Sequence, residues 1–400
     1  MPRSSIRRIF RAANALAEQG ADVVRLDIGD PDFEMPERMV DAIKAAFDAG
    51  RTHYSPMAGL PELRKAVAAH VSAKLGLGGG GLPWERVICS QGATQALNAT
   101  MQLTCDSGSA ILLPSIYFPN YMQQASLAGV TPQLYPLDSS FLPILDSMAD
   151  NYAPSLRAML INSPSNPTGA LFPPDTVRAL YGFARQHNLW IISDEAYIDY
   201  VYDGGHLSPL VVDWEYPEAE RRVLGIFSFS KSYAATGLRM GWTVCPREEV
   251  AMQLGLMNEP FTGSLTTPLQ HGMVAALQVD DTGGRREALR GRRDLATTIL
   301  RDGGFPVNPP AGGIFFFLDI GATGLSGDEF ADTLLEKEHV AVVPGSGFGL
   351  VPEHTGKGDV SFAPNELASR CVRLCFAVPE ERLRQGVERM VRFIASAMAT

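Results

Sequence analysis

The chain has 400 residues, is 46% hydrophobic and carries a formal net charge of −10. This length and composition exclude a disordered chain and predict two domains, or one large domain with a smaller partner. The acidic balance disfavours nucleic-acid binding, because phosphates would be repelled, although a local basic pocket for a small anion stays compatible with it. No apolar run approaches the ~18 residues that a membrane span requires.

The five cysteines are odd in number and include no CxxC pair. This pattern argues against a disulfide framework and a zinc site, so we expect no metal and a reducing, cytoplasmic setting. Cys371 and Cys375 lie in an apolar run and are expected to be small buried residues.

The N-terminal residues 4–20 combine arginines with apolar residues in an amphipathic pattern. An organelle transit peptide would look similar. We favour a structural helix that packs on the body of the protein, because the segment runs directly into a strand-like stretch at residues 23–28.

Helical patterns follow between Pro36 and Gly50 and again after Pro61, where apolar residues recur at a spacing of four. The glycine-rich residues 76–81 lack the Lys-Ser/Thr pair of a P-loop. They are interpreted as a flexible surface connection.

Short apolar strands then alternate with amphipathic helices. Strands are predicted at residues 86–90, 110–113, 158–162, 190–193, 223–229 and 241–245, and helices at 92–104 and 174–187. This alternation predicts an α/β domain whose mostly parallel sheet is covered by helices on both faces.

Beyond about residue 285 the pattern changes to a long helix, a strand at 313–319, a helix at 328–337 and a final helix. It predicts a smaller α+β domain. The expected division is 1–50 as an N-terminal segment joining the small domain, 51–285 as the large domain and 286–400 as the small domain.

Polar residues follow several of the predicted strands, and ligands of α/β folds gather at the carboxyl ends of parallel strands. Gly92-Ala93-Thr94 opens a helix and would suit a phosphate, although an ordinary helix cap is the commoner explanation. The turn 166–169, Asn-Pro-Thr-Gly, is chemically bland by itself.

Asp194 and Lys231 are the most informative of these residues. A carboxylate at the end of a buried strand is costly unless it is paired with a cation, although Asp194 could also cap a helix. A lysine at such a strand end can be a Schiff-base nucleophile, whereas a surface position is the default for any single lysine.

The order Asn166, Asp194, Tyr197, Lys231, Arg239 resembles the class I/II aminotransferase family of fold-type I pyridoxal 5′-phosphate (PLP) enzymes. The residues 228–242, SFSKSYAATGLRMGW, are similar to the lysine signature of that family. Further similar stretches cover essentially the whole chain: LDIGDPDF at 26–33, YSPMAGLPELR at 54–64 and CVRLCFA at 371–377.

The resemblance implies a role for each residue around the cofactor ring. Lys231 would form the internal aldimine and then act as general base and acid. Asp194 would pair with the pyridine nitrogen, with Glu195 as the nearest competitor, and so draw electrons from the substrate α-carbon. Asn166 and Tyr197 would bind the phenolic oxygen.

The resemblance also implies a phosphate site and a homodimer in which the two subunits share their active sites. The backbone of Ala93 and Thr94, the hydroxyls of Thr94 and Ser228, and the guanidinium of Arg239 would bind the phosphate. Tyr54 would reach the phosphate of a neighbouring subunit, which implies a homodimer with shared sites.

Phe118 would stack on the ring, with Tyr117 as a rival because the loop looks one residue longer than in some relatives. Arg373 would clamp the substrate α-carboxylate, beside Gly29 and Asn166, whereas an edge-strand arginine facing solvent is the alternative.

Two features depart from the family pattern. Ala93 occupies the middle of the triplet before the phosphate helix. This alanine should weaken phosphate binding little, because the contact is made by the backbone. Residues 351–370 look longer than usual and are interpreted as a lid, an interface loop or a tolerated surface insertion.

The implied activity is transamination between an amino acid and a 2-oxo acid. The same residues also suit a PLP-dependent lyase, a replacement or cyclisation enzyme, or an oxidase, because all of these begin with removal of the α-proton. The sequence does not fix the substrate side chain.

Overall fold

The computed structural model describes residues 5–148, 152–278, 282–354 and 360–398. Its largest sheet has seven strands in the order β2-β8-β7-β6-β5-β3-β4. The strands are β2 (Val87–Ser90), β3 (Ala110–Pro114), β4 (Thr131–Tyr135), β5 (Leu156–Asn162), β6 (Trp190–Asp194), β7 (Val223–Ser228) and β8 (Gly241–Val244). β8 runs antiparallel to β2 and β7, and the remaining neighbours are parallel. The predicted mostly parallel sheet is therefore confirmed.

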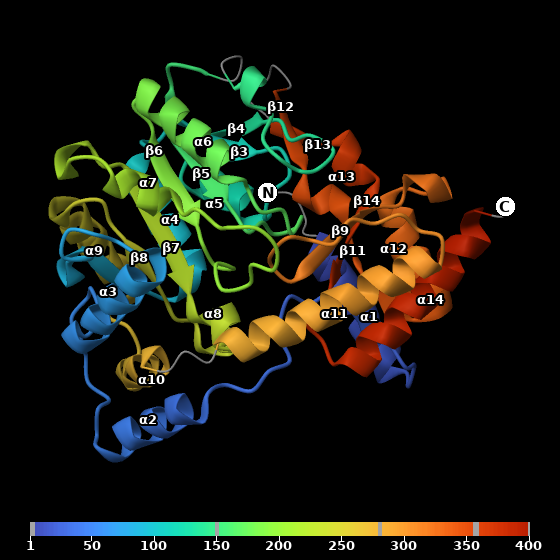
Figure 1. The fold of residues 1–400 in the computed structure, drawn as a ribbon, viewed down its shortest axis with the longest axis horizontal. Helices are drawn as coiled ribbons and strands as arrows, with labels where there is room; N and C mark the ends of the chain where they lie inside the picture. Colours follow the sequence, from blue (N-terminus) through green and yellow to red (C-terminus); the bar gives the residue numbers. More distant parts are fainter. Residues whose placement is uncertain (1–4, 149–151, 279–281, 355–359, 399–400) are drawn as a thin grey trace.

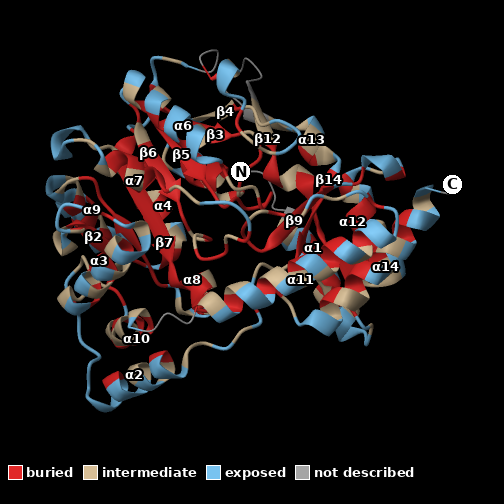
Figure 2. Cartoon of the chain, in the orientation of Figure 1, coloured by how far each residue is buried: buried red, intermediate tan, exposed pale blue. Residues whose placement is uncertain are grey.

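Alternate residues of the central strands pack on opposite faces of this sheet. Ile191 belongs to the hydrophobic cluster of Val177 and Leu180, whereas its neighbour Ile192 belongs to that of Leu97 and Met101. Buried strands with exposed outer helix faces are visible in Figure 2. Helices thus cover both faces, as an apolar run in each strand requires.

The helices are distributed along the whole chain (Figure 1). Their bounds are α1 (Ser5–Glu18), α2 (Glu37–Asp48), α3 (Pro61–Leu75), α4 (Gly92–Thr104), α5 (Asn120–Leu127), α6 (Pro174–Gln186), α7 (Pro209–Trp214), α8 (Phe229–Ser232), α9 (Glu248–Thr262), α10 (Thr267–Leu277), α11 (Thr282–Asp302), α12 (Gly327–Glu338), α13 (Glu366–Ser369) and α14 (Glu380–Met398). α2 lies beside α10, away from the large sheet. No helix among the described residues is long and apolar enough to cross a membrane.

A second, smaller part is built from the C-terminal residues and the N-terminal segment. It has an antiparallel sheet β11-β14-β9, formed by β9 (Phe315–Asp319), β11 (Val343–Pro344) and β14 (Cys371–Cys375), and the parallel pair β1 (Val24–Arg25) with β10 (Val340–Ala341). Its own hydrophobic cluster includes Leu289, Phe330 and Val387. This smaller α+β unit agrees with the predicted fold class, while the domain boundaries at 50 and 285 stay a prediction.

The N-terminal helix packs on this smaller part, as the sequence favoured. Ile9 and Ala13 of α1 are buried in the same cluster as Phe330. The strand predicted at 23–28, however, is wrong in length, because only Val24 and Arg25 pair with a neighbouring strand. Beyond them the Leu26 carbonyl accepts the backbone N–H of Cys375, and the Asp27 carbonyl accepts the Arg373 guanidinium. These bonds tie the segment to β14.

The long segment after residue 350 forms the hairpin β12 (Leu350–His354) and β13 (Val360–Pro364), followed by α13; residues 355–359 lie outside the described part. Leu350 and Phe362 pack against the hydrophobic cluster that contains Tyr117 and Tyr121. The role of this hairpin as a lid, an interface or a tolerated insertion stays untested.

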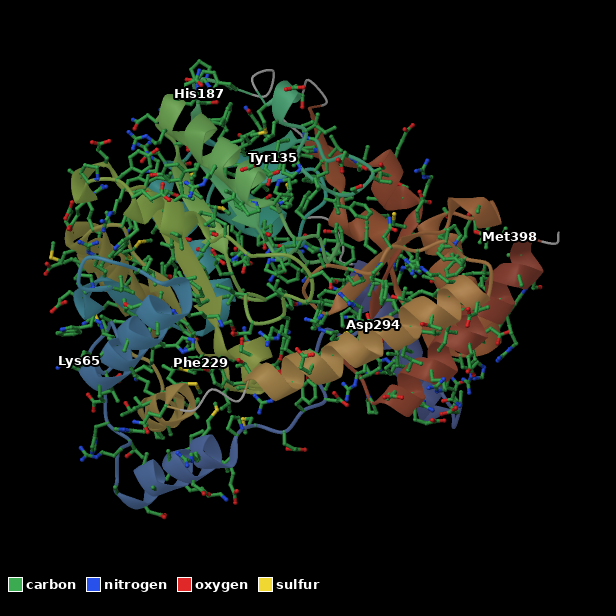
Figure 3. All side chains as sticks on the ribbon, viewed as in Figure 1. Lys65, Tyr135, His187, Phe229, Asp294 and Met398 are labelled. Atoms are coloured by element: carbon green, nitrogen blue, oxygen red, sulfur yellow. The ribbon has the colours of Figure 1, made fainter. Side chains whose placement is uncertain are left out.

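Side chains fill the space between the ribbons throughout, Tyr135 among them (Figure 3). The small and the large parts are joined by α11, whose arginines contact both. Arg285 donates to the carbonyls of Ser232 and Glu34, and Arg292 forms an ion pair with Asp32. These bonds connect α11 both to α8 of the large part and to the N-terminal segment at Asp32 and Glu34.

Candidate active site

The carboxyl ends of three parallel strands meet at one cavity. Asn162 ends β5, Asp194 ends β6 and Ser228 ends β7, and Lys231 follows in the short helix α8. The cavity has a volume of about 330 Å³. It is lined by Ile6, Phe10, Asp27, Ile28, Gly29, Ala93, Thr94, Leu97, Phe118, Tyr121, Asn162, Asn166, Asp194, Ala196, Tyr197, Ser228, Ser230, Lys231, Thr236, Arg239, Phe315 and Arg373. All the predicted site residues except Tyr54 therefore come together.

Lys231 extends its amine toward the N-terminal segment. Its Nζ donates a hydrogen bond to the Gly29 carbonyl oxygen at 2.5 Å. Loss of hydration lowers the pKa of Lys231 to about 8, and the positive charges of Arg373 and Arg239 act in the same direction. The neutral, nucleophilic fraction of the amine near physiological pH is consequently far larger than for an ordinary lysine, while the protonated form still predominates below pH 8.

Asp194 is buried and has no cation among its described partners. Its Oδ2 accepts the Tyr121 hydroxyl at 2.6 Å, and its Oδ1 accepts the Ala196 N–H at 3.1 Å. Burial raises the pKa of Asp194 above its usual range. Since a buried carboxylate is costly without a cation, this group is suited to a cationic ligand atom in the cavity.

Glu195 points away from the cavity. Its carboxylate accepts the Ser193 hydroxyl at 2.9 Å and the Ser208 hydroxyl at 2.6 Å, and lies 2.8 Å from His206 Nε2. Of the two neighbouring acids, only Asp194 lines the cavity.

Asn166 and Tyr197 line the same cavity as Asp194 and Arg373. The Asn166 backbone N–H bonds to Asn162 Oδ1, and its side-chain oxygen accepts Arg373 Nη1 at 3.1 Å. The Tyr197 ring packs edge-on against Phe315, and burial raises the pKa of its hydroxyl. Both residues therefore bring a polar side chain to the lining of the cavity.

The N-terminus of α4 and Arg239 form the second polar end. The first N–H groups of a helix have no intrahelical partner, and Ala93 and Thr94 occupy these positions in α4. Gly92 has φ +71°, and a Cβ there would lie 2.8 Å from Arg239 Nη2. The missing side chain thus lets a guanidinium lie against a helix N-terminus, an arrangement suited to a phosphate. Ser228 and Ser230 line the same end.

Arg373 forms the third polar group and is buried in the central strand of its sheet, which excludes the solvent-facing edge position. Its Nη2 donates to the Asp27 carbonyl at 2.8 Å, and its guanidinium lies over the rings of Phe315 and Phe348 at 4.3 and 4.9 Å. Its Nε is buried and has no partner among the described residues. A buried guanidinium without a carboxylate is a suitable site for a ligand carboxylate.

Phe118 lines the cavity, whereas its rival Tyr117 is turned toward the hairpin, where its hydroxyl donates to the Leu350 carbonyl at 2.6 Å. Tyr54 is 94% exposed and lies outside the cavity of its own chain.

Several lining residues were missed by sequence reasoning. Asn162 could have been found, because it is a polar residue at the end of a predicted strand, much as Asp194 directly follows one. Tyr121 follows Phe118 in the same loop, but nothing local distinguishes it as the partner of Asp194. Ile6, Phe10 and Phe315 reach the cavity only through tertiary packing.

Comparisons with known proteins agree with this geometry. The family model described as aminotransferase class I and II matches residues 21–390. The chain belongs to the class I and II aminotransferases.

Aspartate aminotransferase of Pyrococcus horikoshii is 30% identical over 395 residues, covering 97% of this chain and 94% of the relative. The arginine–pyruvate transaminase of Pseudomonas aeruginosa is 34% identical over 378 residues, covering 92% of this chain and 94% of the relative. The solved structure of an aromatic aminotransferase from Pyrococcus horikoshii superposes with a TM-score of 0.83 at 29% identity, covering 96% and 99% of the two chains. The chain is accordingly an aminotransferase, and its relatives are named for three different substrate classes.

Proposed function

We propose that this aminotransferase binds PLP through Lys231 and transfers an amino group between an amino acid and a 2-oxo acid. The observation that carries the proposal is the buried Asp194 carboxylate, which has no cation among its described partners and faces the same cavity as the Lys231 amine, whose pKa is lowered by burial. Class I and II aminotransferases are generally PLP-dependent.

The residues present suit each part of the cofactor. Asp194 would hold a proton on the pyridine nitrogen, because its charge is otherwise uncompensated. The N–H groups of Ala93 and Thr94, with Ser228 and Arg239, would bind the phosphate. Asn166 and Tyr197 would bind the phenolic oxygen, and Phe118 would cover a ring face. PLP, when bound, supplies a carbonyl carbon that accepts an amine and a ring that withdraws electrons.

The remaining residues act on the amino acid. Arg373 would bind its α-carboxylate, because this buried guanidinium forms no ion pair with a described residue and Asn166 accepts its Nη1 at 3.1 Å. The Gly29 carbonyl holds Lys231 Nζ near that end of the cavity. Lys231 would then remove the proton from the substrate Cα and return a proton during the transfer.

Two exposed polar side chains suggest a second subunit. Arg239 is exposed in the single chain, and Tyr54 is almost fully exposed, although a tyrosine usually buries much of its ring. We infer a homodimer in which Tyr54 contributes to the phosphate site of the partner.

The five free cysteines accord with a cytoplasmic location, which we also propose.

A half-reaction tests the proposed function. Purified holoenzyme mixed with an amino acid, with no acceptor present, should form one equivalent of the 2-oxo acid and of pyridoxamine phosphate. Lys231→Ala should abolish both products. Release of ammonia together with turnover beyond one equivalent, in the absence of an acceptor, would instead indicate an elimination or oxidase reaction.

A further inference from the structure

Helix α1 contributes two apolar side chains to the cavity. Ile6 and Phe10 are one helical turn apart, so they lie on the same face of α1. The neighbouring face carries Ile9 and Ala13, which are buried in the core of the small part. One face of α1 therefore packs in the core of the small part, and the neighbouring face lines the cavity.

The position of α1 is fixed by ion pairs and packing. Arg8 pairs with Asp328, at 2.9 Å, and with Asp332 of α12. The Arg25 guanidinium lies over the Phe10 ring, 4.9 Å from its centroid, and bonds to Asn14. Phe10 is thus held against the cavity by contacts with its own chain.

Each basic side chain that lines the cavity is already assigned to a part of the cofactor or of the substrate backbone. Three described lining residues are basic: Lys231, Arg239 and Arg373. In the proposed function they serve the amine, the phosphate and the α-carboxylate. A second carboxylate on the substrate would find no further cation among these residues.

Charge near α1 also disfavours an ionic substrate side chain. Asp27 lines the cavity, but its two oxygens accept Arg25 Nε and Nη2 at 2.8 and 2.9 Å. The pair is internally compensated. A compensated pair offers a substrate carboxylate no net attraction, and it leaves Asp27 without a free negative charge for a basic side chain among the described residues near α1.

We propose that the side-chain subsite lies against Ile6, Phe10 and Ile28 and takes amino acids with a neutral apolar side chain, aromatic ones included. The inference rests on the proposed placement of the cofactor and α-carboxylate. It names Phe10 as a specificity-determining residue, since an apolar wall stabilises an apolar side chain by excluding water from both.

Single-turnover rates of the holoenzyme with L-phenylalanine, L-leucine, L-alanine, L-aspartate and L-arginine test the inference. Phenylalanine and leucine should exceed alanine by about tenfold or more, because even one methylene in an apolar pocket is worth roughly that factor. Faster reaction with aspartate or arginine than with phenylalanine would overturn it while leaving transamination intact.

A binding measurement tests this inference independently of catalysis. 3-Phenylpropanoate, which carries a carboxylate and a ring but no amine, should bind the holoenzyme about tenfold more tightly than succinate. Equal or tighter binding of succinate overturns the inference, whether or not any amino acid is turned over. Failure of every donor, with this preference retained, would count against the proposed function alone.

A variant then tests Phe10 directly. Phe10→Ala should reduce the ratio of the phenylalanine rate to the alanine rate by about fivefold or more. Arg11→Ala, on the exposed side of the same helix, should leave that ratio unchanged. An unchanged ratio in Phe10→Ala would overturn the assignment of this residue, and using a ratio removes any general effect on folding.

Discussion

Asp194 and Lys231 are charged groups in surroundings that disfavour charge. Burial raises the pKa of Asp194 and lowers that of Lys231, so both are shifted toward their neutral forms. Tyr121 and Ala196 offset only part of this cost for Asp194 by hydrogen bonding. A cationic ring nitrogen near Asp194 would offset the remainder, which is why this residue is expected to affect rate.

Substitution of Asp194 by Asn should slow the half-reaction on the order of 100-fold, because a neutral amide cannot stabilise the positive charge on the ring. The rate of pyridoxamine phosphate formation at saturating amino acid measures this effect. Asp175→Asn, in the exposed first turn of α6, is the matched control and should react at the wild-type rate. A larger loss in Glu195→Gln than in Asp194→Asn would reverse the assignment of the two acids.

The lowered pKa of Lys231 predicts how the cofactor-free protein reacts with PLP. Only the neutral amine is nucleophilic, so the attachment rate should rise about tenfold per pH unit at acidic pH and level off above a midpoint of about 8. An ordinary lysine would keep rising to 10.5. Stopped-flow absorbance between pH 6 and 10 measures the midpoint, and a value near 10.5 would contradict the effect of burial.

At the scale of elements, the periodic sequence pattern predicted the helices and strands whose bounds depend on local packing. The helix at 92–104 has the predicted bounds as α4, and the strands before Asp194 and Lys231 lie where expected. The strand at 23–28 was overpredicted because distant groups on β14 capture its carbonyls. The places of Phe315, Ile6 and Phe10 depend in the same way on contacts between segments far apart in the chain, which no local pattern records.

The start of α4 depends on a glycine, and a matched pair of substitutions tests it. Gly92→Ala should weaken PLP binding about tenfold or more, because a Cβ would displace Arg239 and because a left-handed alanine costs about 1 kcal/mol. Gly182→Ala, in an exposed and open position within α6, should instead stabilise the protein by about 1 kcal/mol. Equilibrium titration with PLP and chemical unfolding measure the two effects. Equal PLP affinity in both variants would contradict the role of Gly92.

At the scale of the whole molecule, the cavity is assembled from both parts of the chain. Asp194 ends a strand of the large sheet and Lys231 lies in α8, which follows another strand of that sheet, whereas Arg373, Phe315 and Phe10 come from the smaller part. α11 links the two through Arg285 and Arg292. Arg239, which we assign to the phosphate, is exposed, and this is where a second copy would complete the site.

Mixed dimers test whether the site is shared. Lys231→Ala inactivates its own site, and Tyr54→Phe should weaken the site of the partner at limiting PLP. In a hybrid of the two variants, one site then carries both defects and the other carries none. Random reassociation should therefore restore about one quarter of wild-type activity from two nearly inactive proteins. Remixed wild-type protein is the control for losses during reassociation. Activity that never exceeds the mean of the two separate variants would show that Tyr54 does not serve a partner, and the exposed ring would need another explanation.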